Sequence, residues 1–133
     1  MSERRYILVV EDDPDLRDTL TEVLEAAGYT VAGARDGLEA LSELRTMTRR
    51  PDLILLDLQM PNMDGAQFRA AQMQTAELAD IPVALLTADA RGGEQALSLK
   101  TAAFLRKPLK LPQLLSMIPE VIERHAASHG RPQ

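Results

Sequence analysis

Five residues of this chain carry groups suited to phosphoryl chemistry, and each ends or follows a run of apolar residues. Glu11 and Asp12 follow the first run, Asp57 ends another, and Thr87 and Lys107 end or follow two later ones. Carboxylates held together repel one another and raise each other's pKa unless a cation lies between them. Oxygen ligands suit Mg²⁺, and a carboxylate beside that ion and a lysine ammonium is placed to attack a phosphoryl group. The combination therefore indicates phosphoryl transfer to a carboxylate.

Asp57 is the most informative of these residues because of the sequence around it. Four apolar residues, Leu53–Leu56, precede it and predict a short strand that is buried on both faces. Pro61 and Gly65 lie in the turn-forming segment that follows. Ligands of open parallel sheets gather outside the carboxyl ends of the strands, which makes this acid a candidate site residue. On this stretch alone, an ordinary turn or helix-capping aspartate explains Asp57 equally well.

Apolar runs and helical periodicity alternate along the chain. The runs predict five strands, at residues 6–10, 30–34, 53–57, 81–87 and 102–105. Helical spacing predicts five helices, beginning near Asp13, Asp36, Gly65, Ala90 and Leu111, with the last one ending near Glu123. Asp13 and Asp36 are interpreted as helix caps rather than as ligands.

Five strands that alternate with five helices through short loops predict an α/β fold of the flavodoxin-like type. We expect a doubly wound five-stranded parallel sheet with helices on both faces. Residues 1–124 are expected to form one domain, and residues 125–133 a polar C-terminal tail that is frayed. A parallel sheet would bring the five candidate side chains to one edge, since each of them ends or follows a strand.

Composition argues against several classes of function. The 133 residues are 45% hydrophobic and 26% charged, which fits one globular domain. A net charge of -5 argues against a surface that binds nucleic acid directly, and the lack of cysteine excludes disulfides and thiolate metal sites. Nothing resembles a signal peptide or a membrane-crossing stretch, so we expect a cytoplasmic protein without membrane contact.

Four segments of the chain, in this order, resemble the receiver domains of two-component response regulators. They are Val9–Asp13, Leu55–Pro61 together with Met63–Gly65, Leu86–Ala88, and Phe104–Pro108. The resemblance covers almost the whole chain. It implies the receiver-type version of the fold. It also implies a protein that is not an enzyme but a phospho-acceptor that assists its own phosphorylation and dephosphorylation.

The resemblance implies a role for each acidic candidate. Asp57 would accept a phosphoryl group from a phosphohistidine of a sensor histidine kinase or of a phosphotransfer protein. Asp12 and Asp57 would bind Mg²⁺ directly, and Glu11 would bind it through water. The backbone carbonyl of Gln59 would complete the protein ligands.

The resemblance also implies a switch beside the phosphoryl group. Thr87 and Lys107 would contact the phosphoryl oxygens, Ala88 would leave room for them, and the Lys107–Pro108 bond would be cis. Phe104 would turn inward when Thr87 moves, although an aromatic residue in a short strand is also typical of the core. The changed surface would act on a downstream protein partner or on an attached output domain.

The resemblance implies that two further positions set the lifetime of the phosphoryl group. Gln59 and Asp89 lie two residues beyond Asp57 and Thr87 and flank the expected path of a hydrolytic water. The sequence gives no direction for their effect.

The segment between Thr87 and Lys107 departs from the family pattern. It is short, it contains Gly92-Gly93, and it has Lys100-Thr101 where the family usually has a glycine–alanine pair. We therefore expect intact phosphorylation chemistry together with an unusual output surface.

Three alternatives remain beside a phosphorylation switch. A receiver-like module that docks partners without phosphorylation is favoured by the altered segment and opposed by the intact Asp57, Thr87 and Lys107. An aspartyl-phosphate hydrolase would need a second acid where Gln59 stands. A flavodoxin-like flavin binder would need a glycine- and hydroxyl-rich phosphate loop after the first strand, and none is present.

Overall fold

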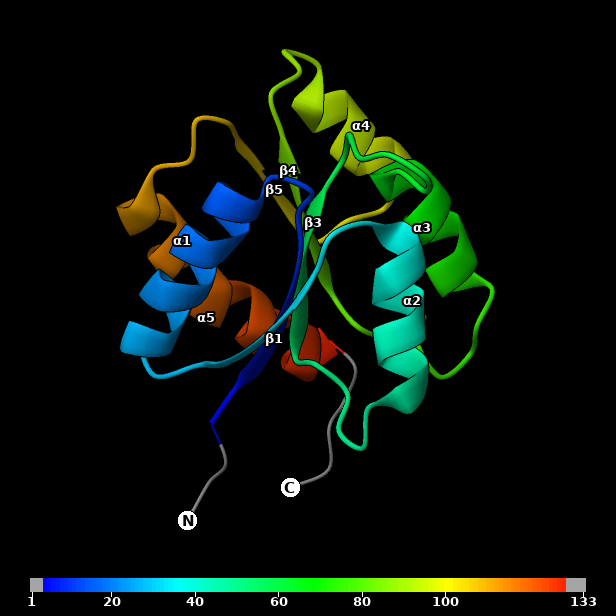
Figure 1. Cartoon of the computed structure of the whole chain (residues 1–133), viewed down its shortest axis with the longest axis horizontal. Coiled ribbons are helices and arrows are strands. Elements are labelled where there is room, and N and C mark those ends of the chain that lie inside the picture. The colour runs from blue at the N-terminus through cyan, green and yellow to red at the C-terminus, as the bar shows by residue number, and fades with distance from the viewer. Residues whose placement is uncertain (1–3, 129–133) are drawn as a thin grey trace.

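The five predicted strands form one parallel sheet in the computed structural model, which describes residues 4–128. The strands are β1 (Tyr6–Val10), β2 (Thr30–Ala34), β3 (Leu53–Asp57), β4 (Val83–Thr87) and β5 (Ala103–Arg106). Their order in the sheet is β2-β1-β3-β4-β5, so the winding reverses between β1 and β3 (Figure 1). The predicted doubly wound architecture is confirmed, and its switch point lies beside β1 and β3, where ligands of such sheets gather.

Five helices cover the two faces of the sheet. They are α1 (Pro14–Ala26), α2 (Gly37–Thr46), α3 (Gly65–Met73), α4 (Gly92–Ser98) and α5 (Leu111–Ser128). Figure 1 shows α1 and α5 on one side of the sheet and α2, α3 and α4 on the other. Two separate hydrophobic clusters correspond to these two layers.

The central strands are apolar up to the polar residues that end β3 and β4, because both faces of these strands are covered. Along β1, Ile7 and Val9 belong to the cluster under α1 and α5, whereas Leu8 and Val10 belong to the cluster under α2, α3 and α4. All four side chains are fully buried. Phe68 of α3 is also fully buried and belongs to the cluster under α2, α3 and α4. A continuous apolar run, rather than an alternating one, is what a strand buried on both faces requires.

Aspartates begin three of the helices. The side chains of Asp13, Asp36 and Asp64 each accept a hydrogen bond from a backbone N–H in the first turn of the helix that follows. These contacts satisfy backbone donors that have no partner within the helix. The predicted capping roles of Asp13 and Asp36 are confirmed.

Two boundaries near the site differ from the sequence prediction. β4 begins at Val83 rather than Ile81, because Pro82 has no backbone N–H to donate to a neighbouring strand. α4 covers Gly92–Ser98, so it begins two residues later than the predicted start near Ala90. The peptide bond between Lys107 and Pro108 is cis, as predicted.

The end of the last helix was predicted wrongly. α5 continues to Ser128 instead of ending near Glu123, so residues 125–128 of the expected frayed tail are helical. Ala126 and Ala127 are strong helix formers, and the prediction gave too much weight to the polar residues around them. The rest of the expected tail lies outside the described residues.

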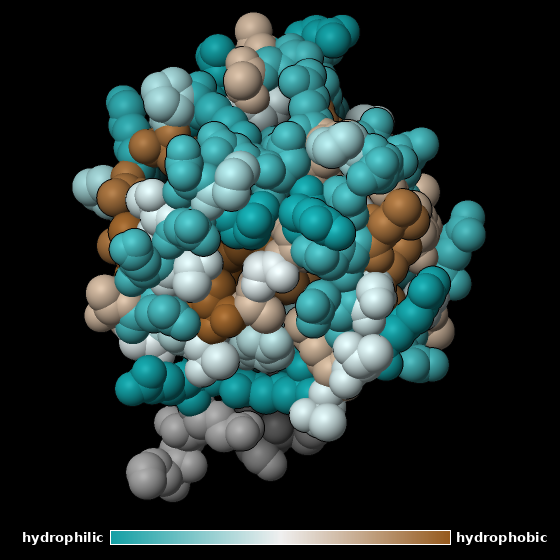
Figure 2. Space-filling model, in the orientation of Figure 1, coloured by the Kyte–Doolittle hydropathy of each residue, from teal (hydrophilic) through white to brown (hydrophobic). Residues whose placement is uncertain are grey.

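The outer surface is largely polar on the side seen in Figure 2, where hydrophobic residues are visible only in small separate areas. No helix within residues 4–128 is long and apolar enough to cross a membrane.

Candidate functional site

Three carboxylates meet at the carboxyl ends of two neighbouring strands. Glu11 and Asp12 directly follow β1, and Asp57 is the last residue of β3, which pairs with β1. Each of the three residues offers one oxygen atom, and these atoms lie within 4.8 Å of one another. Glu11 is fully buried and Asp57 is 4% exposed, whereas Asp12 is exposed to solvent. The predicted acidic cluster is therefore assembled, with one open side.

Lys107 supplies the positive charge of this cluster. Its Nζ lies 2.9 Å from Glu11 Oε1 and 3.2 Å from Asp57 Oδ1. The backbone N–H of Lys107 donates to the carbonyl of Thr87, which extends the pairing of β5 with β4 and fixes where the side chain starts. One ammonium thus bridges two buried carboxylates.

The surroundings change the pKa of both Asp57 and Lys107. Burial raises the pKa of Asp57 to about 7, and the charge of Glu11 and hydrogen bonds with Glu11 and Asp12 act in the same direction. The charge of Lys107 lowers this pKa but does not cancel the rise. Burial lowers the pKa of Lys107, but its contacts with Glu11 and Asp57 outweigh burial, so this pKa lies above its ordinary value.

The donor set of the cluster fits a small divalent cation. Three carboxylates supply oxygen ligands only, and more negative charge than one lysine can neutralise. The exposed Asp12 leaves room for the waters that Mg²⁺ keeps in its coordination shell. Gln59 lies two residues beyond Asp57 and is exposed, and the role expected for its carbonyl stays a prediction.

A glycine positions the loop that follows Asp57. A Cβ atom at Gly65 would lie 2.7 Å from the carbonyl oxygen of Asp57 and 2.8 Å from the Cα of Leu58. The backbone N–H of Gly65 donates to the carbonyl of Leu58 at 2.8 Å. The start of α3 therefore packs directly on the end of β3, which only a residue without a side chain permits.

Thr87 ends β4, the strand between β3 and β5, and is 1% exposed. Its Oγ1 accepts a hydrogen bond from the backbone N–H of Asp89 at 3.0 Å. A threonine hydroxyl that accepts one hydrogen bond can still donate its own hydrogen to another group. The contact expected between this hydroxyl and a phosphoryl oxygen stays a prediction.

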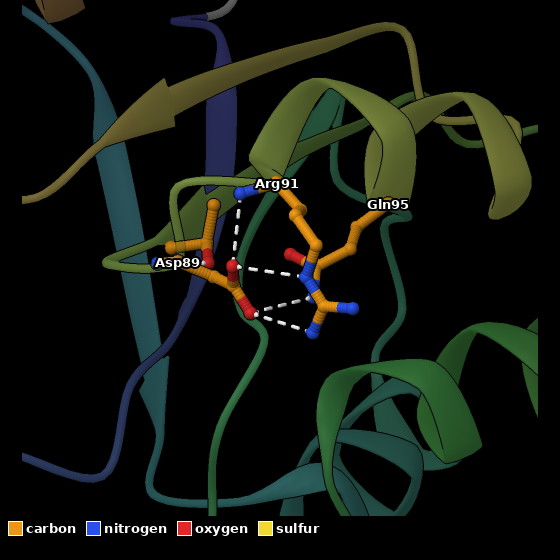
Figure 3. A network of polar contacts seen from close by, with 4 residues as sticks. Asp89, Arg91 and Gln95 are labelled. Atoms are coloured by element: carbon orange, nitrogen blue, oxygen red, sulfur yellow. Dashed lines mark hydrogen bonds and ion pairs between the residues drawn. The ribbon is translucent and has the colours of Figure 1, made fainter.

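The side chain of Asp89 is held by α4 (Figure 3). Its carboxylate accepts hydrogen bonds from the backbone and guanidinium of Arg91 and from the amide of Gln95. The hydrogen bond from the Arg91 backbone, aided by the Arg91 side chain, holds the pKa of Asp89 below its ordinary value. In Figure 3 the side chain of Arg91, just before α4, and that of Gln95, within α4, extend toward this carboxylate.

Phe104 lies outside the core. It is 39% exposed and belongs to β5, where it pairs with Leu85 of β4. The alternative that Phe104 is simply a buried core residue is therefore wrong, because the side chain points to the half-exposed surface beside α4. Its expected movement stays a prediction.

Two arginines donate hydrogen bonds to backbone carbonyls at Glu11 and just after α4, and the sequence did not predict these contacts. Arg17 of α1 donates to the carbonyl of Glu11 at 2.7 Å. Arg69 of α3 is 7% exposed and donates to the carbonyls of Leu99 and Lys100, just after α4. Backbone carbonyls are acceptors at every position, so no spacing in the sequence could have revealed these two contacts.

The chain is similar to a known protein family and to response regulators of mycobacteria. The sequence model described as "Response regulator receiver domain" matches residues 7–119. Response regulator MprA of Mycobacterium sp. (strain KMS) is 35% identical over 126 residues, which cover 93% of this chain and 53% of that protein. DNA-binding response regulator MtrA of Mycolicibacterium smegmatis is 36% identical over 124 residues, covering 92% of this chain and 52% of that protein.

A solved structure gives the same match over nearly the whole chain. The signal receiver domain of a signal transduction histidine kinase from Syntrophus aciditrophicus has a TM-score of 0.80 and is 34% identical. The match covers 97% of this chain and 95% of that one. By contrast, the chain spans about half the length of the curated relatives it matches.

Proposed function

The chain belongs to the response regulator receiver domain family, and from that premise we propose that it is a switch driven by phosphorylation of Asp57. The phosphoryl group comes from a phosphohistidine on a sensor histidine kinase or on a phosphotransfer protein. The observation that carries the proposal is the buried Asp57 carboxylate, held between Lys107 and two further acids.

Each residue of the cluster has a part in the transfer. An oxygen of Asp57 attacks phosphorus, the phosphorus–nitrogen bond to the donor histidine breaks, and the histidine leaves with the electron pair. Lys107 neutralises charge on the transferring oxygens, and the Thr87 hydroxyl donates to one of them. The backbone N–H of Lys107 stays bonded to Thr87, which keeps these two residues in register.

Mg²⁺ would be held by Asp12 and Asp57, with Glu11 acting through water and the carbonyl of Gln59 as a further ligand. When bound, it would neutralise the acidic cluster and the phosphoryl oxygens. The carboxylate donor set supports this assignment.

The output follows from a change of charge and packing at the site. A phosphorylated Asp57 draws the Thr87 hydroxyl toward it, and Phe104 then turns inward from its half-exposed position. The protein is a phospho-acceptor that assists its own phosphorylation and dephosphorylation, not an enzyme acting on a separate substrate.

The partners follow from the family and from the relatives. The relatives include a DNA-binding response regulator about twice as long as the matched region. We propose that this domain acts on a downstream protein or on an attached output domain, without binding nucleic acid or a membrane directly. A cytoplasmic location stays a prediction from the sequence. No specific observation favours the alternative of a phosphorylation-independent docking module.

Titration with beryllofluoride and Mg²⁺, followed by amide NMR spectra, tests the proposal without a kinase. The complex imitates a phosphoryl group on an aspartate. We expect the amide signals of Thr87 and Lys107 to shift in wild-type protein and to stay in place in Asp57→Asn. A wild-type spectrum that does not change on titration would overturn the proposal.

A further inference from the structure

The space beside the methyl group of Thr87 is left open by one glycine of α4. A Cβ atom at Gly92 would lie 2.8 Å from Thr87 Cγ2 and 3.3 Å from Phe104 Cδ2. Carbon atoms in favourable contact are roughly 3.5–4.0 Å apart. An alanine at position 92 would therefore collide with Thr87 and press on the Phe104 ring.

The backbone conformation does not explain why position 92 is a glycine. Among the described glycines only Gly28 has a positive φ, so an alanine could adopt the backbone conformation of Gly92. Gly92 is the first residue of α4, and glycine favours a helix less than alanine does. The requirement at this position is for space.

A shift of α4 away from Thr87 would disturb hydrogen bonds near both ends of the helix. Asp89 binds Arg91 and Gln95 in the first turns of the helix (Figure 3). Arg69 binds the carbonyls of Leu99 and Lys100 just beyond its other end. The C-terminal end of α4 is thus held to α3, and its first turns are held to the loop that follows β4.

The strain would instead fall on the side chain of Thr87. Thr87 is β-branched, so its methyl and hydroxyl move together between a few rotamers. In the observed rotamer the hydroxyl accepts from the Asp89 backbone N–H, while the methyl occupies the space that Gly92 leaves. Displacing the methyl also displaces the hydroxyl.

We propose that Gly92 is a positioning residue that keeps the Thr87 hydroxyl in its observed place, bonded to the Asp89 backbone N–H, by leaving room for the Thr87 methyl. The inference rests on the proposed function for its effect on phosphorylation. It goes beyond that function because it assigns a role to a residue that touches neither phosphoryl group nor metal. Gly92 also links Thr87 and Phe104 sterically, since one added methyl would contact both.

The test compares Gly92→Ala with Gly93→Ala, a matched change at the next residue of the same helix. A Cβ atom at Gly93 would meet only the Phe104 ring, at 3.4 and 3.6 Å. Loss of one donor to developing negative charge typically slows a reaction by about a hundredfold or more, and misplacement costs part of that. We expect Gly92→Ala to slow phosphorylation by a small phospho-donor roughly tenfold or more, and Gly93→Ala to stay within about twofold of wild type.

Thr87→Ser provides the decisive background, because it keeps the hydroxyl and removes Cγ2. In this background Gly92→Ala should slow phosphorylation by less than about twofold. Equal rates for Gly92→Ala and Gly93→Ala would overturn the inference, as would an undiminished effect of Gly92→Ala in the Thr87→Ser background. If Gly92→Ala fails to fold, the double variant should fold, and a double variant that also fails would overturn the inference.

Hydrogen exchange of the Asp89 backbone N–H distinguishes a failure of this inference from a failure of the proposed function. Its hydrogen exchange should be faster in Gly92→Ala than in Gly93→Ala, because the hydrogen bond to the Thr87 hydroxyl is lost. This measurement needs no phosphoryl group. Wild-type protein that is never phosphorylated would refute the proposed function. The inference about Thr87 would then stand if exchange at Asp89 is faster and fall if it is unchanged.

Discussion

The ammonium of Lys107 lies 3.2 Å from Oδ1 of Asp57, although their strands are not neighbours in the sheet. Asp57 ends β3 and Lys107 follows β5, with β4 between them. The contact therefore passes over the end of β4, where Thr87 lies. The order of the strands brings the ion pair of Asp57 and Lys107 close to the buried hydroxyl of Thr87. The sheet topology itself therefore assembles the site.

Asp57→Asn is expected to stabilise the protein in the absence of Mg²⁺. The folded-state pKa of Asp57 is about 7 against an ordinary value of 3.8, so the folded protein binds the extra proton between these values. Stability of the wild type therefore falls as pH rises through this window and levels off above it. The variant should gain up to roughly 4 kcal/mol at about pH 8 and little at about pH 4, measured by urea unfolding. An equal gain at both pH values would contradict this prediction.

Mg²⁺ is expected to stabilise wild-type protein, and more at about pH 8 than at about pH 5. Metal binding requires ionised carboxylates, and Asp57 is largely protonated at the lower pH. At a Mg²⁺ concentration a hundredfold above the dissociation constant, the gain is about 2.7 kcal/mol. Thermal unfolding with Mg²⁺ or with a chelator measures it, and Asp57→Asn should reduce it. The account is contradicted if Mg²⁺ has the same effect on both proteins.

Lys107→Met is expected to destabilise the protein by roughly 2–3 kcal/mol at about pH 8, because it leaves buried Glu11 and Asp57 without their cation. Lys110→Met is the matched control, since Lys110 is exposed and the change should cost less than about 0.5 kcal/mol. Chemical unfolding of both variants gives the comparison. Equal losses of stability would show that the ion pairs with Lys107 contribute nothing of their own.

Substitutions at Gln59 and Asp89 are expected to change the lifetime of the phosphoryl group. Both residues lie two positions beyond a central site residue, and Asp89 is held by Arg91 and Gln95 beside Thr87. We expect Gln59→Ala combined with Asp89→Ala to alter the dephosphorylation rate about threefold or more. Loss of phosphoryl signal over time, measured with Mg²⁺ present, provides the rate. An unchanged rate in the double variant would refute a role for these positions.

The parts of the site that could be predicted from sequence are those fixed by strand ends. Glu11, Asp12, Asp57 and Lys107 follow apolar runs, and a parallel sheet brings the ends of such runs together. The capping roles of aspartates could be predicted because the cap precedes its helix directly in the sequence. Local and topological rules were enough for both.

The parts that could not be predicted depend on where long side chains reach in space. The family resemblance implied that Lys107 contacts the phosphoryl oxygens, but nothing in the sequence indicated a direct ion pair with Glu11. The contacts of Arg69 with Leu99 and Lys100 join residues about thirty positions apart, and they depend on how α3 packs beside α4. The end of α5 was missed because weak local preferences, rather than a stop signal, decide where that helix ends.

Intact mass after incubation with Mg²⁺ and a small phospho-donor tests the central claim most directly. Wild-type protein should gain one phosphoryl group, and the gain should be absent without Mg²⁺ and absent in Asp57→Asn. Asp18→Asn, at an exposed position of α1, should gain the group as wild type does. A wild-type protein whose mass does not change, or an Asp57→Asn variant that is modified equally well, would contradict the account of Asp57 as the phospho-acceptor.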